Sequence, residues 1–206
     1  MTSLLKSLFR RWRYRSRKMR LTKMGIRLPQ NDKEFFWLCS IFDDMHVKKY
    51  LEIGSREGGS LFVIAGMLEA GAHVVAVDLP GAQWGRRGSQ NYLNEVTKLI
   101  RREGLSVDIL LGDSHSETTH QRVRGLADEQ AFDALFIDGD HSYEGVSRDW
   151  EMYSPFVRPG GVVAFHDLII SDEFPDVGVG HLFEELKENH EWDARQELYG
   201  IGVVWK

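Results

Sequence analysis

Short apolar segments alternate with longer amphipathic segments along most of the chain, and this alternation limits the folds that the chain can adopt. Five segments have the pattern of buried strands, each running into glycine or polar residues: 48–55, 73–80, 106–114, 132–140 and 160–167. The segments between them show helical periodicity over roughly 10–15 residues. Strands separated by such helices form right-handed βαβ units, which build a parallel sheet with helices on both faces. The sequence therefore predicts a doubly wound α/β fold.

Two further elements frame this core. The chain closes with two strands, 194–200 and 201–206, which we expect to form a hairpin around Gly200 or Gly202. A helix over residues 31–45 precedes the first strand, because its apolar residues recur at helical intervals and Asn31 suits an N-cap.

Charge is distributed unevenly along the chain. Residues 1–28 carry ten Lys or Arg side chains and no acidic one, whereas residues 29–206 carry 16 basic and 31 acidic side chains. We therefore divide the chain into a basic N-terminal arm, 1–28, and one domain, 29–206. Apolar residues of the arm fall at helical spacing: Leu4, Leu5, Leu8, Phe9 and Trp12. The arm can thus form an amphipathic helix suited to an anionic membrane surface or a nucleic acid. The alternative is a partly disordered arm that packs on its own acidic domain.

The expected compartment follows from what these segments lack. The arm is too short in apolar residues for a transmembrane helix, which needs ~20 of them, and it has no secretory-signal pattern. Cys39 is the single cysteine, which excludes an internal disulfide framework and a zinc site of the CxxC kind. We expect a reducing, cytoplasmic setting, with the arm offering peripheral attachment to the inner membrane face.

Small and polar residues follow the predicted strands. Because the carboxyl ends of parallel strands share one edge, where open α/β sheets bind ligands, we expect these residues to form one site. The first strand leads into EIGSREGGS, which contains Glu52, Gly54, Ser55, Gly58 and Ser60. Its glycines let the backbone approach a ligand, and the helix that follows presents N–H groups to an anion. The glycine spacing differs from the GxGxxG of nicotinamide-binding proteins.

Two more strand ends belong to the same edge. Asp78 ends the second strand, where a carboxylate can accept hydrogen bonds from both hydroxyls of a ribose. Asp113 and Ser114 end the third strand and offer hydrogen-bonding groups to an adenine edge. Each residue alone also fits an ordinary turn, and it is their shared edge that indicates a nucleoside-containing ligand.

Four segments together resemble the class I S-adenosylmethionine-dependent methyltransferases, within them the macrocin-type and cephalosporin-hydroxylase-like O-methyltransferases. They are YLEIGSREGGS, VVAVDLPG, LLGDSH and FIDGDHSYEGVSRDWEMYSPFVRPGGVVAFHD, and the resemblance covers about residues 46–206. It implies a Rossmann-like, seven-stranded sheet whose last strand is antiparallel. Gly54, Ser55 and Ser60 would then face the methionine part of S-adenosylmethionine, Asp78 the ribose, and Asp113 with Ser114 the adenine. Glu52, Gly58 and Asp138 complete the implied cofactor site.

The resemblance also assigns a catalytic role to the fourth and fifth strand ends. In catechol-type and macrocin-type relatives, the aspartate after the fourth strand binds Mg²⁺ with an acidic pair after the fifth, and a basic side chain three residues on is the general base. Asp138 holds the metal position, His141 the base position, and His166-Asp167 the place of the acidic pair. Histidine, with a pKa near ~6.5, can accept a hydroxyl proton at neutral pH. Because one carboxylate is replaced by imidazole, metal preference shifts from Mg²⁺ toward Mn²⁺, Fe²⁺ or Zn²⁺, or else no metal binds and His166 is a second base.

Some of these residues have simpler interpretations. Asp140 and Ser142 suit the cap of the next helix, and His166 can hydrogen-bond a backbone carbonyl. His115 and His120 are expected on a solvated loop. The loop over residues 80–90 follows a strand end and is a candidate lid, in which Trp84, Arg86 and Arg87 could contact substrate.

The leading hypothesis is an O-methyltransferase acting on a small molecule, a sugar or a glycoside. One alternative is a nucleotide-dependent oxidoreductase or hydroxylase on a similar sheet. Another is a non-catalytic binding protein tethered by its arm. We expect deletion of residues 1–27 to leave cofactor affinity intact, and the sequence leaves the acceptor and the oligomeric state open, a homo-oligomer included.

Overall fold

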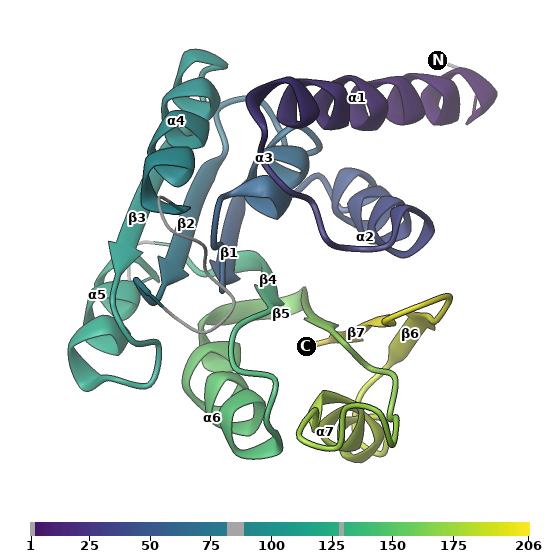
Figure 1. The fold of residues 1–206 in the computed structure, drawn as a ribbon, viewed down its shortest axis with the longest axis vertical. Coiled ribbons are helices and arrows are strands. Elements are labelled where there is room, and N and C mark those ends of the chain that lie inside the picture. The colour runs from purple at the N-terminus through teal and green to yellow at the C-terminus, as the bar shows by residue number, and fades with distance from the viewer. Residues whose placement is uncertain (1–2, 82–88, 128–129) are drawn as a thin grey trace.

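The computed structural model describes residues 3–81, 89–127 and 130–206, and helices and strands alternate along it as predicted (Figure 1). The strands are β1 (Lys49–Ile53), β2 (His73–Asp78), β3 (Ser106–Leu111), β4 (Phe132–Ile137), β5 (Val157–His166), β6 (Trp192–Arg195) and β7 (Ile201–Trp205). The helices are α1 (Ser3–Met24), α2 (Asp32–Asp44), α3 (Gly59–Ala65), α4 (Ser89–Arg102), α5 (Glu117–Ala127), α6 (Tyr143–Tyr153) and α7 (Val179–Leu186).

The strands form one seven-stranded sheet in the order β3-β2-β1-β4-β5-β7-β6. β1 to β5 pair in parallel, and β7 is antiparallel to both of its neighbours, β5 and β6. The predicted doubly wound sheet with an antiparallel last strand is therefore confirmed. The strand order reverses between β1 and β4, so the carboxyl ends of these two strands border the crevice in which such sheets bind ligands.

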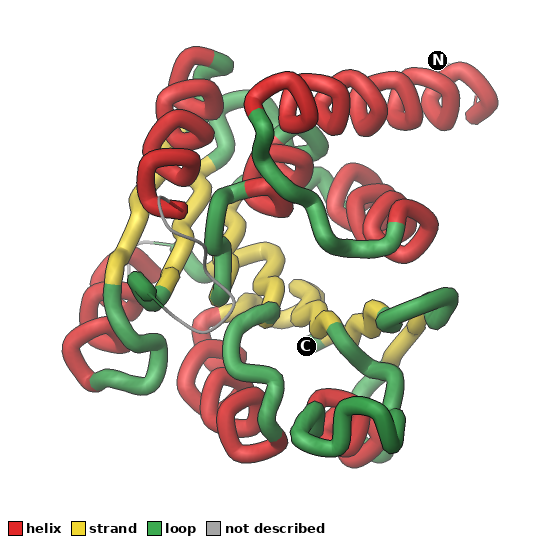
Figure 2. Tube along the Cα trace, in the orientation of Figure 1, coloured by secondary structure: helices red, strands yellow, loops and turns green. Residues whose placement is uncertain are grey.

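Successive strand residues point to opposite faces of the sheet and enter two separate cores. Ala134 and Phe136 of β4 pack with residues of α1, α2, α3 and α4, whereas Leu135 and Ile137 pack with residues of α5, α6 and α7. Figure 2 shows the strands between these two groups of helices. Burial on both faces explains why the central strands are continuously apolar.

The basic arm forms α1, which packs on the sheet domain. Tyr14 and Leu21 of α1 and Ile26 after it are buried in the first of the two cores. Basic side chains on the same side pair with acidic ones of the domain: Lys6 with Asp44, Arg10 and Arg13 with Asp43, Lys18 with Asp32, and Arg17 and Arg20 with Glu103. The division into an arm and a domain starting at residue 29 thus needs correction, because the arm supplies core residues. No described helix is both long and apolar enough to span a membrane.

The C-terminal hairpin differs from its predicted register. β6 ends at Arg195, and a five-residue loop, 196–200, replaces the expected continuation of the strand to Gly200. Glu34 of α2 causes this difference, because its buried carboxylate accepts hydrogen bonds from the backbone N–H groups of Glu197, Leu198 and Gly200 at 2.6, 2.6 and 3.1 Å. The middle of the predicted lid, including Trp84, Arg86 and Arg87, lies outside the described residues.

Candidate active site

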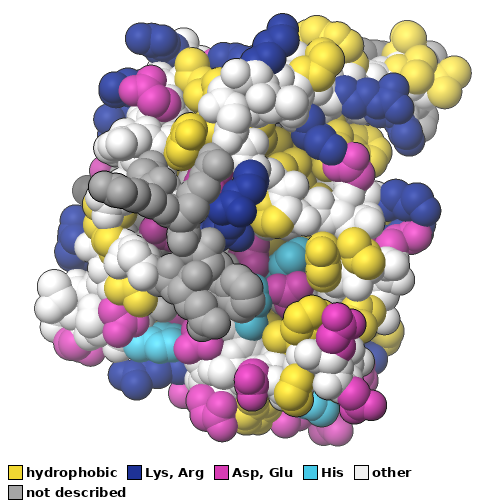
Figure 3. Space-filling model, in the orientation of Figure 1, with side chains coloured by type: hydrophobic (Ala, Val, Ile, Leu, Met, Phe, Trp, Pro, Cys, Tyr) yellow, Lys and Arg dark blue, Asp and Glu magenta, His cyan; other side chains and the backbone are white. Residues whose placement is uncertain are grey.

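A cavity of about 1170 Å³ opens at the carboxyl edge of the sheet, beside the point where the strand order reverses. Figure 3 shows histidine and acidic side chains gathered near the centre of this face. Ten residues predicted from the strand ends line the cavity: Gly54, Ser55, Ser60, Asp78, Asp113, Ser114, Asp138, His141, His166 and Asp167. The structure therefore brings stretches from five strands together around one space.

Gly54 lies where β1 and β4 come closest. Its φ is +93°, and a Cβ atom built on it would be 2.1 Å from the backbone oxygen of Asp138. Its N–H donates to Val77 O at 2.9 Å, while Asp138 N–H donates to Ile53 O at 2.9 Å. Only glycine combines this φ with this contact, so Gly54 allows the strand ends to converge at the cavity.

Two of the predicted cofactor-binding residues, Glu52 and Gly58, do not line the cavity. Glu52 is fully buried, and its two carboxylate oxygens accept hydrogen bonds from Tyr50 Oη at 2.6 Å and Ser60 Oγ at 2.7 Å. Burial raises the pKa of Glu52 to about 7. Gly58 is the N-cap of α3 at φ +81°, and its Cα faces Leu93 and Val96 of α4. Both residues stabilise the turn between β1 and α3. Their positions do not favour direct contact with a ligand.

Asp78 projects from the end of β2 into the cavity. Its Oδ1 accepts a hydrogen bond from Arg56 N at 2.7 Å, and no described group hydrogen-bonds to its second carboxylate oxygen. Arg56 has a φ of +47°, a strained conformation that aims its N–H at this carboxylate. Burial raises the pKa of Asp78 to about 6. The geometry suits a carboxylate that accepts hydrogen bonds from a ligand.

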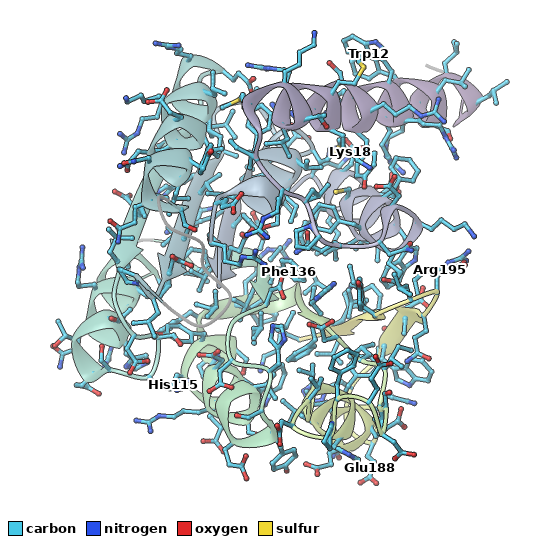
Figure 4. All side chains as sticks on the ribbon, in the orientation of Figure 1. Trp12, Lys18, His115, Phe136, Glu188 and Arg195 are labelled. Atoms are coloured by element: carbon cyan, nitrogen blue, oxygen red, sulfur yellow. The ribbon has the colours of Figure 1, made fainter. Side chains whose placement is uncertain are left out.

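The end of β3 is supported by a buried residue that the sequence did not reveal. Asp113 Oδ1 accepts a hydrogen bond from His115 N at 2.8 Å, and His115 Nε2 lies 3.2 Å from Oδ1 of Asp149, a fully buried residue of α6. This contact with Asp149 raises the pKa of His115. His115, labelled in Figure 4, lies on a loop as predicted, but there it lines the cavity beside Asp113. His120 does not lie on a loop: it belongs to α5, and its ring stacks on that of Phe156 with 5.2 Å between the ring centroids.

Four titratable side chains form one compact group, which we call the Asp–His cluster: Asp138, His141, His166 and Asp167. His141 Nδ1 lies 2.9 Å from Asp167 Oδ2, and its Nε2 lies 3.4 Å from Asp138 Oδ1. His166 Nδ1 lies 3.2 Å from Asp138 Oδ1 and 3.0 Å from Asp167 Oδ2. Asp167 has a φ of +65°, another strained residue at the cavity.

The charges of the Asp–His cluster balance one another. Burial would raise the pKa of Asp138, but the neighbouring His166 and His141 hold that pKa well below its usual range. Burial would lower the pKa values of both histidines, but the two carboxylates raise each of them to about 10. The two carboxylates are thus neutralised by positive charge on the imidazole rings. His141 can act as a base only in its neutral form. That form requires another positive charge to stabilise the carboxylates of Asp138 and Asp167.

The donor atoms of the cluster fit a divalent metal ion. One ligand atom each from Asp138, His141 and Asp167 lies within 4.8 Å of the others. His166 is 5% exposed, yet neither ring nitrogen has a hydrogen-bond partner of acceptable geometry in the described structure. Carboxylate and imidazole donors together suit Mn²⁺, Fe²⁺ or Zn²⁺. The group contains the predicted ligands Asp138 and Asp167, with His141 in the place predicted for His166.

The interpretation of Ser142 as a helix-capping residue is confirmed, whereas Asp140 stabilises the turn before the cap and accepts no hydrogen bond from the helix itself. Ser142 is the N-cap of α6 and its Oγ accepts a hydrogen bond from Gly145 N at 3.0 Å. Asp140 Oδ1 accepts one from Ser142 N at 2.9 Å. This turn holds His141 between Asp140 and Ser142 at the cavity wall. The expected hydrogen bond from His166 to a backbone carbonyl is absent from the described contacts.

The segment between α1 and α2 forms another wall of the cavity, and no sequence pattern indicated it. Gln30 is 6% exposed, and its Nε2 donates a 2.7 Å hydrogen bond to Asp138 Oδ2. Arg27 pairs with the buried Glu57 at 3.0 Å, and its carbonyl oxygen lies where a side chain on Gly59 would be. Pro29 restricts the backbone of this segment just before Gln30, but nothing in the neighbouring sequence indicates the distant partner of Gln30.

Comparison with known proteins agrees with this architecture. A family described as "Methyltransferase domain" matches residues 51–168, which is more than half of the chain. The uncharacterized protein R132 of Acanthamoeba polyphaga mimivirus is 30% identical over 118 residues, 57% of this chain and 50% of that protein. The chain thus spans about half the length of this curated relative.

Solved structures share the fold over nearly the whole chain. An O-methyltransferase from Bacillus cereus in complex with S-adenosylhomocysteine has a TM-score of 0.66 and 17% identity, covering 94% of this chain and 90% of that one. The O-methyltransferase TomG from Streptomyces achromogenes, in complex with S-adenosylmethionine, has a TM-score of 0.62 and 15% identity, covering 94% and 88%. A methyltransferase from Podospora anserina, PaMTH1, bound to S-adenosylhomocysteine, has a TM-score of 0.61 and 16% identity, covering 96% and 87%. The solved structures thus share the fold, and the match over more than half of the chain shows that the chain belongs to the methyltransferase-domain family.

Proposed function

We propose that the protein transfers the methyl group of S-adenosylmethionine to a hydroxyl oxygen of a small molecule, a sugar or a glycoside. The observation that carries this proposal is that Gly54, Asp78, Asp113 and Asp138, from four strand ends, line one cavity at the reversal of strand order. The fold shared with O-methyltransferases crystallised with S-adenosylhomocysteine or S-adenosylmethionine supports it.

In this proposal the cofactor extends across the carboxyl edge from β4 to β3. The ribose hydroxyls donate to Asp78, whose carboxylate already accepts one hydrogen bond from Arg56 N. Asp113 and His115 would hold the adenine, and the backbone at Gly54 would lie beside the methionine part. The sulfonium methyl group would then be presented on the side of the Asp–His cluster.

The reaction needs one proton acceptor and good alignment. The acceptor oxygen attacks the methyl carbon, the carbon–sulfur bond breaks, and its electron pair stays on sulfur to give S-adenosylhomocysteine. The hydroxyl proton passes to a ring nitrogen of neutral His141. Alignment of oxygen, carbon and sulfur supplies most of the rate enhancement, because it removes the entropy cost of bringing the reactants together.

We further propose that the Asp–His cluster holds a divalent cation such as Mn²⁺ or Mg²⁺. Asp138 and Asp167 would hold it together with His166, whose Nδ1 lies 3.2 and 3.0 Å from their carboxylates, which leaves His141 to accept the proton. When bound, the cation supplies the positive charge that leaves a histidine neutral, and it lowers the pKa of the acceptor hydroxyl. Gln30 would keep Asp138 oriented by its 2.7 Å hydrogen bond.

Apolar side chains beside the cluster favour an acceptor with an apolar or aromatic face next to its hydroxyl. Ile169, Phe174, Leu198 and Tyr199 all line the cavity and are 38–56% exposed. The Tyr199 ring lies 5.8 Å from the ring of His166, so this apolar wall borders the proposed reaction centre. Either an aromatic ring or the CH face of a sugar would cover it.

Calorimetry with S-adenosylhomocysteine and with NAD separates the two enzyme classes. We expect binding of S-adenosylhomocysteine and none of NAD. The reverse result would replace the methyltransferase proposal with the oxidoreductase alternative.

The roles of His141 and the metal are tested by turnover on a panel of hydroxyl acceptors with labelled S-adenosylmethionine. We expect His141→Ala to abolish turnover while leaving S-adenosylhomocysteine affinity unchanged, and the exposed His181→Ala on α7 to be the matched control. We expect EDTA to stop turnover and Mn²⁺ to restore it. Turnover that is indifferent to EDTA would remove the metal from the proposal.

A further inference from the structure

Helix α1 has two faces of different character. The inner face packs on the domain through the buried side chains of Tyr14 and Leu21. Its basic residues are paired with acidic residues of α2 and with Glu103, as described above. Figure 4 shows Lys18 on the side of α1 that faces α2 and Trp12 on the opposite side. The contacts that hold α1 in place thus use only half of its surface.

The outer face carries large apolar side chains that remain exposed. Leu4, Trp12 and Met19 are 70%, 62% and 61% exposed; the exposed apolar residues from Leu4 to Trp12 recur at intervals of three or four residues, and Met19 follows two turns later. The exposed apolar residues of α1 are Leu4, Leu5, Leu8, Phe9, Trp12 and Met19. Burying such side chains in a core would stabilise a protein, so their repetition on a solvent face indicates a binding surface.

Basic residues without a described acidic partner border these apolar residues. Arg11, Arg15 and Lys23 are exposed, and no described acidic side chain forms an ion pair with any of them, although Arg11 also lies 5.2 Å from the centre of the Phe36 ring of α2. The first acidic residue in the sequence is Asp32, so α1 itself contains none. The outer face, which we define as the six exposed apolar residues with Arg11, Arg15 and Lys23, therefore combines apolar area with uncompensated positive charge.

We propose that the outer face of α1 binds an anionic lipid surface, with the helix lying in the plane of the membrane interface. Trp12, Phe9 and the leucines would enter the boundary between headgroups and acyl chains, while Arg11, Arg15 and Lys23 would contact lipid phosphates. A nucleic acid would satisfy the charges but leave the aliphatic side chains exposed to water. A second copy of the chain is less suited, because it would bring the same uncompensated positive charge of α1 against itself.

The test is sedimentation of the full chain with vesicles. We expect binding to phosphatidylcholine vesicles that contain phosphatidylglycerol, weak binding to pure phosphatidylcholine, and loss of binding at high salt because exposed charges are screened. Arg11→Glu with Arg15→Glu should weaken binding at least ~25-fold, since each basic residue near an anionic surface contributes about fivefold. Trp12→Ser should weaken it about tenfold or more.

Matched variants separate this proposal from general charge effects. Arg122→Glu with Arg124→Glu, at two exposed positions of α5, changes net charge equally and should leave vesicle binding intact. Equal binding to both vesicle types, or equal loss in the α5 variant, would overturn the proposal. So would preferential binding to duplex DNA, or a dimer in analytical ultracentrifugation that Trp12→Ser dissociates, since these results assign the face to a nucleic acid or to a second copy.

Discussion

Replacement of Leu21 by alanine tests whether the basic N-terminal helix is part of the folded core. Leu21 is 1% exposed and belongs to the core that α1 shares with α2, α3 and α4. Truncating a fully buried leucine removes its transfer free energy and leaves a cavity, which together lower the free energy of unfolding by about 2–5 kcal/mol. For a chain of this size the melting temperature should fall by roughly 5–20 °C.

The matched control lies on the same helix, two residues away. Met19 is 61% exposed, so Met19→Ala changes helix propensity and side-chain size without opening a core cavity. We expect its effect on the free energy of unfolding to stay within about 0.5 kcal/mol. Urea unfolding followed by circular dichroism measures both variants, and the Leu21→Ala midpoint should move without a change in slope. Equal, small effects for Leu21→Ala and Met19→Ala would refute the packing of α1 on the domain.

Three further predictions concern the cavity. Gly54→Ala should lower the affinity for S-adenosylhomocysteine sharply in calorimetry, because the new Cβ would meet Asp138 O at 2.1 Å; unchanged affinity would contradict the close approach of β1 and β4. The pKa of Asp78 is raised to about 6, and a bound ribose would favour its ionised form, so S-adenosylhomocysteine affinity should be constant above pH 6 and fall below it by up to ~tenfold per pH unit. Asp78→Asn should flatten that dependence, and a slope unaltered by the substitution would assign it to another group. Gln30→Ala should weaken Mn²⁺ binding about 10–100-fold while sparing S-adenosylhomocysteine binding, as expected for a residue that orients a metal ligand; equal loss of both would indicate local unfolding instead.

The structure also reverses one expectation about truncation. Deleting residues 1–27 removes Tyr14, Leu21 and Ile26 from the core and breaks the pairing of Arg27 with Glu57. We now expect such a deletion to lower both stability and cofactor affinity, where the sequence alone favoured intact affinity.

The fold and the cavity residues were largely predictable because their signals are local and repetitive. Apolar segments such as 73–80 and 132–140 identify strands on their own, and the parallel sheet then requires Asp78 and Asp138 to share an edge. The position of α1 was harder to predict, because a run of arginines is typical of a solvated arm. Only the structure shows that the acidic partners Asp43 and Glu103 lie next to these arginines.

The residues that sequence reasoning missed depend on long-range contacts. Gln30 donates a hydrogen bond to Asp138, 108 positions away, and Asp149 of α6 contacts His115 on the loop after β3. Glu34 shifts the terminal hairpin by accepting three backbone hydrogen bonds from the loop 196–200. No spacing within a single segment records such contacts, since a glutamine or a buried acid looks the same in sequence whether or not it has a distant partner.

The docking of α1 has a consequence for the order in which the polypeptide is made. Arg17 leaves the ribosome 86 residues before its partner Glu103, an interval of about 4–17 s at ordinary elongation rates. The partners of Lys18, Arg10 and Arg13 are made sooner, at Asp32 and Asp43, so for most of this interval only Arg17 and Arg20 of the paired basic residues lack their acidic partner. Quality-control factors and nascent-chain binding partners therefore meet a different surface from the one that the finished enzyme presents.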